Sequence, residues 1–215
     1  MELINLDIFS TPISIESLSF SESDLDELGA VCVRALSENA GVSISNNGGW
    51  HSQPTFFHRK EDISVRTKRL IIASAAQLTQ RVAPSIQLTA LSWEGTAWIN
   101  INSESSYNAP HDHPGYLWSA VLYVRVPTDL KGNEGQLEFL DPRNSVITGA
   151  GQITELQSYF ASNIKVKPEP GMLVVFPSYL KHWVYPHSSD TDRISIAVNL
   201  KLVRKTTRKN RKGED

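Results

Sequence analysis

The second half of the chain is a succession of short runs rich in β-branched and aromatic residues, separated by turns that carry Gly, Pro, Asn or Asp. Runs of this length and spacing predict short strands in an antiparallel sandwich or barrel. The runs cover residues 86–93, 97–101, 118–126, 136–140, 164–166, 172–176 and 194–203. The rest of the chain must therefore pack around a β-rich body.

Two helices are predicted ahead of this body. Residues 21–24 offer N-cap chemistry, and apolar side chains then recur at helical spacing, which predicts a helix over 22–38. A second helical period runs over 63–82 and ends before Pro84. Residues 2–9 alternate loosely and predict a leading strand, whereas 46–49 predict a turn. We expect the helices to cover one face of the sheet, which gives a mainly β fold with flanking helices.

A chain of 215 residues is long enough for one full hydrophobic core. We therefore expect a single domain over 1–203, helical to about 84 and β-rich from about 85. Residues 204–215 are basic with few apolar side chains, which predicts a disordered tail. The net charge of −2 creates no global field that would attract nucleic acid or an anionic membrane.

The cellular setting is indicated by two features. Cys32 is the only cysteine, so an internal disulfide is excluded. Residues 1–7 lack the pattern of a signal peptide, and no apolar run is long enough to span a bilayer as a helix. A soluble, cytoplasmic protein is the expectation. The oligomeric state cannot be read, because edge strands and core strands have similar sequences.

Three of the six histidines form a candidate metal site. His111 and His113 are two residues apart between Pro110 and Pro114, which disfavour helix, so an extended backbone would point both imidazoles to one side. His182 follows another apolar run and is a candidate for a third ligand. Three protein ligands would leave open metal positions for a cosubstrate and dioxygen.

Chance is the competing explanation, because a His-X-His pair by itself is common. The pair gains weight from its position directly before the strongest β run, 118–124, and from Arg193, which lies 11 residues after His182 and begins the final strand. The remaining histidines, His51, His58 and His187, are interpreted as surface or structural residues.

This ordered set of motifs resembles the Fe(II)/2-oxoglutarate-dependent oxygenase superfamily. The pattern there is His-X-Asp or His-X-Glu, then a distal His, then an Arg about ten residues on, often followed by X-Ser. The sequence is most similar to a small family of 2-oxoglutarate–Fe(II) oxygenases from bacterial and phage genomes, over roughly 47–200. The matching stretches are 47–52, 111–115, 119–124, 140–143, 170–178 with His182, and 193–199.

The resemblance implies a double-stranded β-helix, the cupin-like jelly roll, with a metal near one open end. By position, His111 and His182 would be the two histidine ligands and Arg193 would bind the distal carboxylate of 2-oxoglutarate. A guanidinium suits this role because it keeps its charge and can donate two parallel hydrogen bonds. Ser195, on the same strand face, and Tyr123 would contact the same carboxylate; a sheet aromatic is the alternative interpretation of Tyr123.

One position departs from the family pattern. His113 occupies the place of the usual carboxylate, and the adjacent Asp112 should point the opposite way in a regular strand. Either three histidines bind the metal, which we favour, or an irregular backbone brings Asp112 to it. Three neutral imidazoles would leave the Fe(II) site one positive charge higher, which alters redox tuning and makes zinc a rival occupant.

The function implied is a non-haem Fe(II) dioxygenase that couples oxidative decarboxylation of 2-oxoglutarate by dioxygen to hydroxylation of a substrate that the sequence does not identify. Trp98, Asn100, Trp118 and Trp183 are candidates to line its pocket, with core packing as the alternative for the tryptophans. A non-catalytic metal-binding jelly roll is the rival interpretation. A nucleic-acid-binding role for the basic tail is a weaker one, because the body lacks interleaved basic and aromatic residues.

Overall fold

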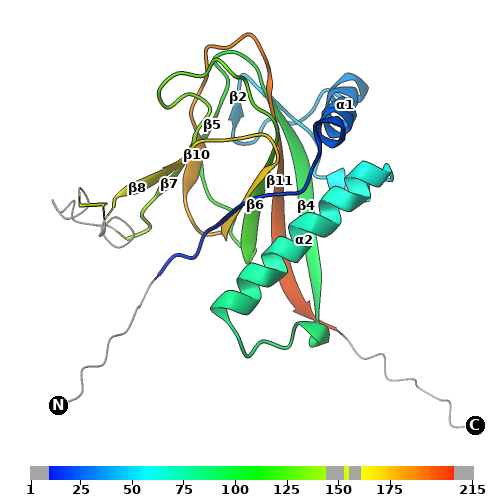
Figure 1. Cartoon of the computed structure of the whole chain (residues 1–215), viewed down its shortest axis with the longest axis vertical. Helices are drawn as coiled ribbons and strands as arrows, with labels where there is room; N and C mark the ends of the chain where they lie inside the picture. The colour runs from blue at the N-terminus through cyan, green and yellow to red at the C-terminus, as the bar shows by residue number, and fades with distance from the viewer. Residues whose placement is uncertain (1–9, 144–152, 155–160, 206–215) are drawn as a thin grey trace, which may run out of the picture.

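The computed structural model describes residues 10–143, 153–154 and 161–205, and these form two β-sheets with two long helices on one side (Figure 1). The larger sheet has the strand order β1-β9-β6-β11-β4-β3, and the smaller one has the order β2-β5-β10-β7-β8. The strands of both sheets pair antiparallel. The strands are β1 (Ser14–Ser17), β2 (Asn46–Asn47), β3 (Trp50–His51), β4 (Leu91–Asn102), β5 (Tyr107–His111), β6 (Trp118–Arg125), β7 (Leu137–Leu140), β8 (Asn163–Val166), β9 (Met172–Pro177), β10 (His182–Val184) and β11 (Arg193–Arg204).

The two helices begin and end where the sequence pattern predicts. The first, α1, spans Glu22–Glu38, and Ser21 caps it with a reciprocal pair of hydrogen bonds to Asp24. The second, α2, spans Asp62–Val82. Both helices lie beside the larger sheet in Figure 1 and bury their apolar faces in a core shared with β4, β6 and β11. Trp118 joins this layer, because its indole nitrogen donates a hydrogen bond of 2.8 Å to the Thr79 hydroxyl of α2.

A second apolar cluster fills the space between the two sheets. Tyr123 and Phe176 enter it from the larger sheet, whereas Leu137, Phe139 and Val184 enter it from the smaller one. The larger sheet is therefore covered by helices on one face and by the smaller sheet on the other. Because side chains alternate along a strand, each central strand supplies the two cores with alternate residues. The helix-covered core receives even-numbered residues from β6 and β11 and odd-numbered residues from β4 and β9.

The strands differ from the prediction in three respects. The run 86–93 is not one strand, because residues 88–90 form a short 3₁₀ helix (Leu88–Ala90) and β4 begins at Leu91. From there β4 continues without a break through the separately predicted run 97–101, because every residue of it pairs with β11. The short strands β1, β2, β3, β5 and β10 were not predicted; their sequences hold Ser, Asn, Pro or His and carry little β signal.

Two predictions fall on residues outside those the structure describes. They are the leading strand over 2–9 and the disordered tail beyond residue 205. At the start of the basic segment, Arg204 still belongs to β11, and Lys205 donates a hydrogen bond from Nζ to the Thr89 carbonyl. Among the helices of the described residues, none has the length and apolar character to cross a bilayer.

The helical layer makes a stability prediction with a matched control on one helix. Leu28 is fully buried in α1, whereas Leu36 on the same helix is 37% exposed. Leu28→Ala removes buried methyl groups and leaves a cavity, so we expect it to lower the free energy of unfolding by about 2–5 kcal/mol. Leu36→Ala should cost less than about 1 kcal/mol. Urea unfolding followed by circular dichroism measures both, and equal losses would contradict the packing of α1 described here.

Candidate functional site

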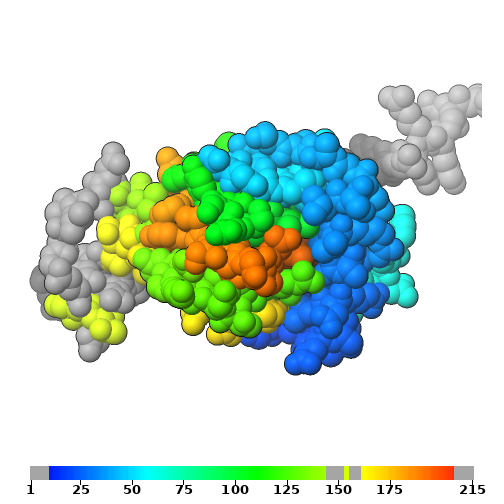
Figure 2. Space-filling view, turned by 90° about the horizontal axis from the view of Figure 1, so that it is seen from above, coloured from blue at the N-terminus to red at the C-terminus, as the bar shows by residue number. Residues whose placement is uncertain are grey.

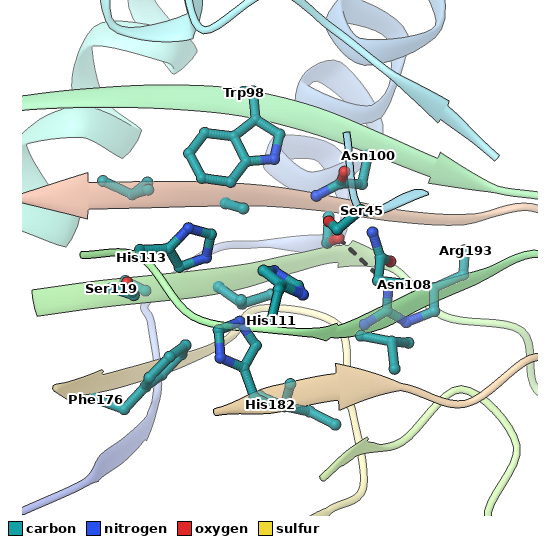
Figure 3. Close-up of a pocket in the computed structure, with 17 residues that line it drawn as sticks. Ser45, Trp98, Asn100, Asn108, His111, His113, Ser119, Phe176, His182 and Arg193 are labelled. Carbon is teal, nitrogen blue, oxygen red and sulfur yellow. Dashed lines mark hydrogen bonds between the residues drawn. The ribbon is translucent and has the colours of Figure 1, made fainter. Parts of the chain in front are cut away.

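A pocket opens between the two sheets and contains all three histidines of the sequence-predicted set (Figure 3). It encloses about 450 Å³, part of it open to solvent. Among its 17 lining residues there is no carboxylate, and Arg193 is the only one with a permanent charge. The other lining residues are Ser45, Trp98, Asn100, Asn108, His111, His113, Ser119, Ala120, Val121, Leu137, Phe176, His182, Val184, Ser195, Ala197 and Val198.

The pairing of β5 with β10 brings two of the histidines together. In this antiparallel ladder His111 is the direct partner of His182, and their ring centroids are 4.4 Å apart. His113 lies two residues beyond the end of β5, with ring centroids 4.9 Å from His111 and 5.3 Å from His182. One potential ligand atom of each residue lies within 4.8 Å of those of the other two, close enough for all three to bind one metal ion.

Backbone hydrogen bonds orient two of these rings. The Nδ1 atom of His111 lies 2.6 Å from the Ala109 carbonyl oxygen, and Nδ1 of His182 lies 2.8 Å from the Leu180 carbonyl oxygen. A carbonyl oxygen only accepts, so in both rings Nδ1 carries the proton and Nε2 is left with a free lone pair. This is the arrangement by which proteins fix the tautomer of a metal-binding histidine.

Burial keeps the three imidazoles neutral at physiological pH. It lowers the pKa of His182 to about 3 and that of His113 to about 4, and the neighbouring His111 adds to both effects. The pKa of His111 is also lowered, mainly by burial, against the opposing influence of a hydrogen bond to Ala109 and of the Asp112 charge. Neutral imidazoles can bind a metal without first losing protons.

The strand β5 ends at His111. His113 donates its backbone N–H to the Ser178 carbonyl at 2.8 Å, on the loop that follows β9, so the strand does not include both histidines. Its ring nevertheless points toward the other two (Figure 3). Asp112 is exposed and is not part of the three-residue cluster. The geometry therefore brings together three histidines and leaves Asp112 outside.

Arg193 lies at the other end of the pocket with an incompletely paired guanidinium. The side chain is 1% exposed, and its Nη1 atom lies 3.4 Å from the Ser195 hydroxyl. Its Cζ atom lies 5.0 Å from the centre of the Tyr123 ring, and Tyr123 is the partner of Ser195 in the β6–β11 ladder. In the part of the chain that is described, Nε and Nη2 have no well-aligned hydrogen-bond acceptor.

This unpaired charge is energetically costly. Burial lowers the pKa of Arg193, and burial also raises that of Tyr123, whose hydroxyl lies near the guanidinium. The Arg193 side chain stays charged, because a guanidinium ordinarily titrates above pH 12. A buried cation with two free donor groups is an anion-binding position, and a carboxylate would satisfy both donors at once.

Loops close the molecule at the end where Arg193 lies. The Pro186 and His187 carbonyls of the loop after β10 accept hydrogen bonds from the N–H groups of Gly135 and Ser105. In the view from above, this orange loop lies among green segments from the middle of the chain (Figure 2). Gly135 also lies against the Arg193 side chain, because a Cβ added at Gly135 would be 3.6 Å from Arg193 Cδ, so the loop that contains Gly135 contributes to its burial.

The other candidates from the sequence are divided between pocket and core. Trp98 and Asn100 line the pocket, as predicted. Trp118 and Trp183 do not: Trp118 bonds to α2, and Trp183 donates a 2.7 Å hydrogen bond to the Glu138 carboxylate on the opposite face of the smaller sheet from the pocket. Phe176, which packs edge-on against His182 at 4.7 Å, was missed, although its place in the predicted strand 172–176 was the available signal.

The remaining histidines have separate positions. His58 is exposed, as expected for a surface residue. His51 and His187 are each 3% exposed, so neither is a surface residue. The Nε2 atom of His187 lies 2.9 Å from the Asn102 carbonyl, whereas the His51 ring stacks on Trp98 with centroids 5.3 Å apart.

The fold that carries this site is that of the 2-oxoglutarate-dependent oxygenases, the jelly roll predicted from the sequence. A prolyl-4-hydroxylase from Pseudomonas putida is 17% identical with a TM-score of 0.57, over 90% of this chain and 93% of that one. The viral collagen prolyl hydroxylase of Paramecium bursaria Chlorella virus 1 is 14% identical with a TM-score of 0.55, over 87% and 94%. The α-ketoglutarate-dependent epimerase SnoN from nogalamycin biosynthesis is 15% identical with a TM-score of 0.61, over 96% and 86%.

A family model matches the sequence of the β-rich part. Residues 96–199 match the family described as "Putative 2OG-Fe(II) oxygenase", which confirms the resemblance seen in the motifs. The matched segment contains His111, His113, His182 and Arg193. Among curated proteins, no relative matches the sequence.

The lowered histidine pKa values predict an acid-sensitive metal-free protein. Below pH 6.5 the unfolded chain binds a proton on His182 that the folded protein, with a pKa of about 3, does not bind. Stability therefore falls as the pH falls, and His182 alone should account for about 2 kcal/mol between pH 7.5 and 5. Urea unfolding in the presence of a chelator, repeated across this range, measures the dependence.

The matched pair for this test is His182→Gln and His58→Gln. His182→Gln should flatten the dependence of the unfolding free energy on pH. His58→Gln, a substitution at an exposed position, should leave that dependence as in the wild type. An unchanged pH dependence in His182→Gln would show that this imidazole is not held neutral by burial.

Proposed function

We propose that this protein is a non-haem Fe(II)/2-oxoglutarate-dependent dioxygenase that hydroxylates a substrate still to be identified. One observation carries the proposal: a neutral three-histidine cluster and a buried, incompletely paired arginine share a single pocket. The family match and the oxygenase folds support it. Among these folds, the enzyme HygX of Streptomyces hygroscopicus is described with nickel and 2-oxoglutarate bound.

The residues present fit a divalent metal. His111 and His182 present Nε2 atoms whose tautomers are set by the Ala109 and Leu180 carbonyls, and His113 completes the set. Imidazole nitrogens are suitable ligands for Fe(II), and three of them leave open positions. Bound there, iron would supply the oxidative chemistry that consumes dioxygen and 2-oxoglutarate.

The opposite end of the pocket fits a carboxylate of the cosubstrate. Nε and Nη2 of Arg193 would donate to it, and the Ser195 and Tyr123 hydroxyls are near enough to the guanidinium to take part. Binding would pair a charge that is now buried without a partner, so much of the affinity should come from this interaction. The dicarboxylate would then extend from Arg193 toward the histidines.

Between these ends, the side chains of the chain line the pocket. Leu137, Phe176 and Val184 contribute apolar side chains that exclude water, whereas Asn100 and Asn108 contribute amide groups. A dry and rigid pocket limits side reactions of an oxidising intermediate and holds reactants in place. The protein's own contribution is therefore position and exclusion of water.

A metal-binding protein without turnover is the second candidate. It is favoured by one observation: His113 lies where the superfamily pattern has a carboxylate, so the three-histidine set carries no negative charge. The higher charge of the site would alter metal preference, and zinc would suit such a set. This candidate shares the metal site but does not require 2-oxoglutarate to be consumed.

The test separates metal binding, cosubstrate binding and turnover. Protein prepared without oxygen is titrated first with Fe(II) and then with 2-oxoglutarate, and succinate is measured after air is admitted. We expect binding of one metal per chain, then binding of 2-oxoglutarate, then slow succinate release even without the primary substrate. Tight metal binding with neither 2-oxoglutarate binding nor succinate would establish the second candidate instead.

Variants at each end of the pocket test which end binds the metal and which end binds 2-oxoglutarate. His182→Ala should reduce metal content by at least about tenfold through loss of a ligand. Arg193→Gln should weaken 2-oxoglutarate binding by at least about 30-fold, because truncating one partner of a buried charge pair costs about 2–5 kcal/mol, while metal binding stays within a few-fold. Arg204→Gln, at the exposed end of the same strand, is the control and should change neither.

A further inference from the structure

The three histidines of the site are held in place by different means. His111 and His182 belong to paired strands, and each has a ring nitrogen bonded to a backbone carbonyl. His113 lies beyond the strand and is tied through its backbone N–H to Ser178. Within the described residues, the His113 ring makes no hydrogen bond that would fix its orientation. Metal-binding histidines normally have such a partner, so another contact must orient this ring.

Trp98 makes that contact from the larger sheet. Its ring meets the His113 ring edge-on, with centroids 5.6 Å apart and planes at 62°. Figure 3 shows Trp98 beside His113, on the side away from His182. The two other imidazoles are on the remaining sides of His113, at 4.9 and 5.3 Å. The indole therefore closes the space into which the His113 ring would otherwise rotate.

Trp98 is in turn supported by His51. The two rings stack with centroids 5.3 Å apart and planes at 17°. β3 pairs with β4 so that His51 is opposite Asn100, which places it diagonally across from Trp98 on one sheet face. Ser52 then makes two bonds of 2.9 Å to Ile99, from its N–H to the carbonyl and from the Ile99 N–H to its hydroxyl.

His51 itself is held firmly. Its Nδ1 atom lies 2.7 Å from the Ser52 carbonyl oxygen, and the side chain is 3% exposed. The contacts therefore run from His51, which is held by its hydrogen bond, to Trp98, which stacks on His51, and then to His113, which meets Trp98 edge-on. A segment far from the metal ligands in sequence, 50–52, reaches the site through this series of rings.

We propose that Trp98, which stacks on His51, is a positioning residue that orients the His113 imidazole toward the metal. By holding this third ligand in place, Trp98 raises the affinity of the site for the metal. The inference rests on the proposed function, because it assumes that the three histidines bind a metal. It assigns to His51 and Trp98 a role that a plain pocket wall would not have. A wall residue would affect what enters the pocket, whereas a positioning residue affects metal binding when nothing else is present.

The experiment uses Co(II) alone as the probe, with metal-free full-length protein, no 2-oxoglutarate and no substrate. Visible absorption of Co(II) reports both affinity and ligand geometry. Trp98→Leu should weaken Co(II) binding about 10- to 100-fold and change the spectrum, as expected when the support of a ligand is lost. Trp98→Phe keeps an aromatic edge and should recover most of the affinity. His51→Leu should also weaken Co(II) binding, and His51→Phe, which keeps an aromatic ring, should weaken it less.

Trp93→Leu provides the matched control, because it is the same substitution on the same strand, and Trp93 lies on the opposite face of β4 and packs against the helical core. It should leave Co(II) affinity within about threefold of the wild type. An equal loss in Trp93→Leu and Trp98→Leu would overturn the proposal, since it would indicate a general effect on the strand.

A double-mutant cycle gives the decisive readout. In a His113→Ala background, Trp98→Leu should have almost no further effect on Co(II) affinity, because the residue through which it acts is absent. Full additivity of the two losses would overturn the positioning role. If the wild-type protein bound no Co(II), the proposed function itself would fail, whereas binding that is unaffected by Trp98→Leu would reject only this inference.

Discussion

Two-residue alternation along β11 is the constraint on which both the core and the site depend. Ile194, Ile196 and Leu200 enter the helix-covered core, whereas Arg193 and Ser195 face the pocket between the sheets. Because adjacent residues point to opposite faces, a shift of one residue in register would place the guanidinium in the apolar core and the isoleucines in the pocket. Pairing of β11 with both β4 and β6 along much of its length prevents such a shift.

The electrostatics of the pocket follow from its lining. Burial removes the proton from the imidazoles of His113 and His182 at neutral pH but leaves the Arg193 guanidinium charged. No carboxylate lines the described pocket to balance that charge. The site is thus built to receive a cation among neutral nitrogens at one end and an anion at the other. This separation of roles is what the proposed chemistry needs, and it arises from burial rather than from a network of ion pairs.

Much of the fold and of the site was predictable from local patterns. The helical period with its Ser21 cap defined α1, and apolar runs marked β6, β9 and β11. The short strands β5 and β10 were not predictable by pattern, since their pairing and not their composition makes them strands. The same holds for His51, whose burial depends on the pairing of β3 with β4, two strands that α2 separates in the sequence.

The sequence alone determined which residue types are available and in what order: two histidines two apart, a distal histidine, and an arginine at the start of the last strand. It also carried the resemblance to the 2-oxoglutarate–Fe(II) oxygenases, because that order is far more specific than any single motif. The tertiary structure decided that His111 faces His182 across a ladder, that His113 rather than Asp112 joins them, and that Trp98 and His51 pack behind His113. These are contacts between segments distant in sequence, and they form only when the two sheets close on each other.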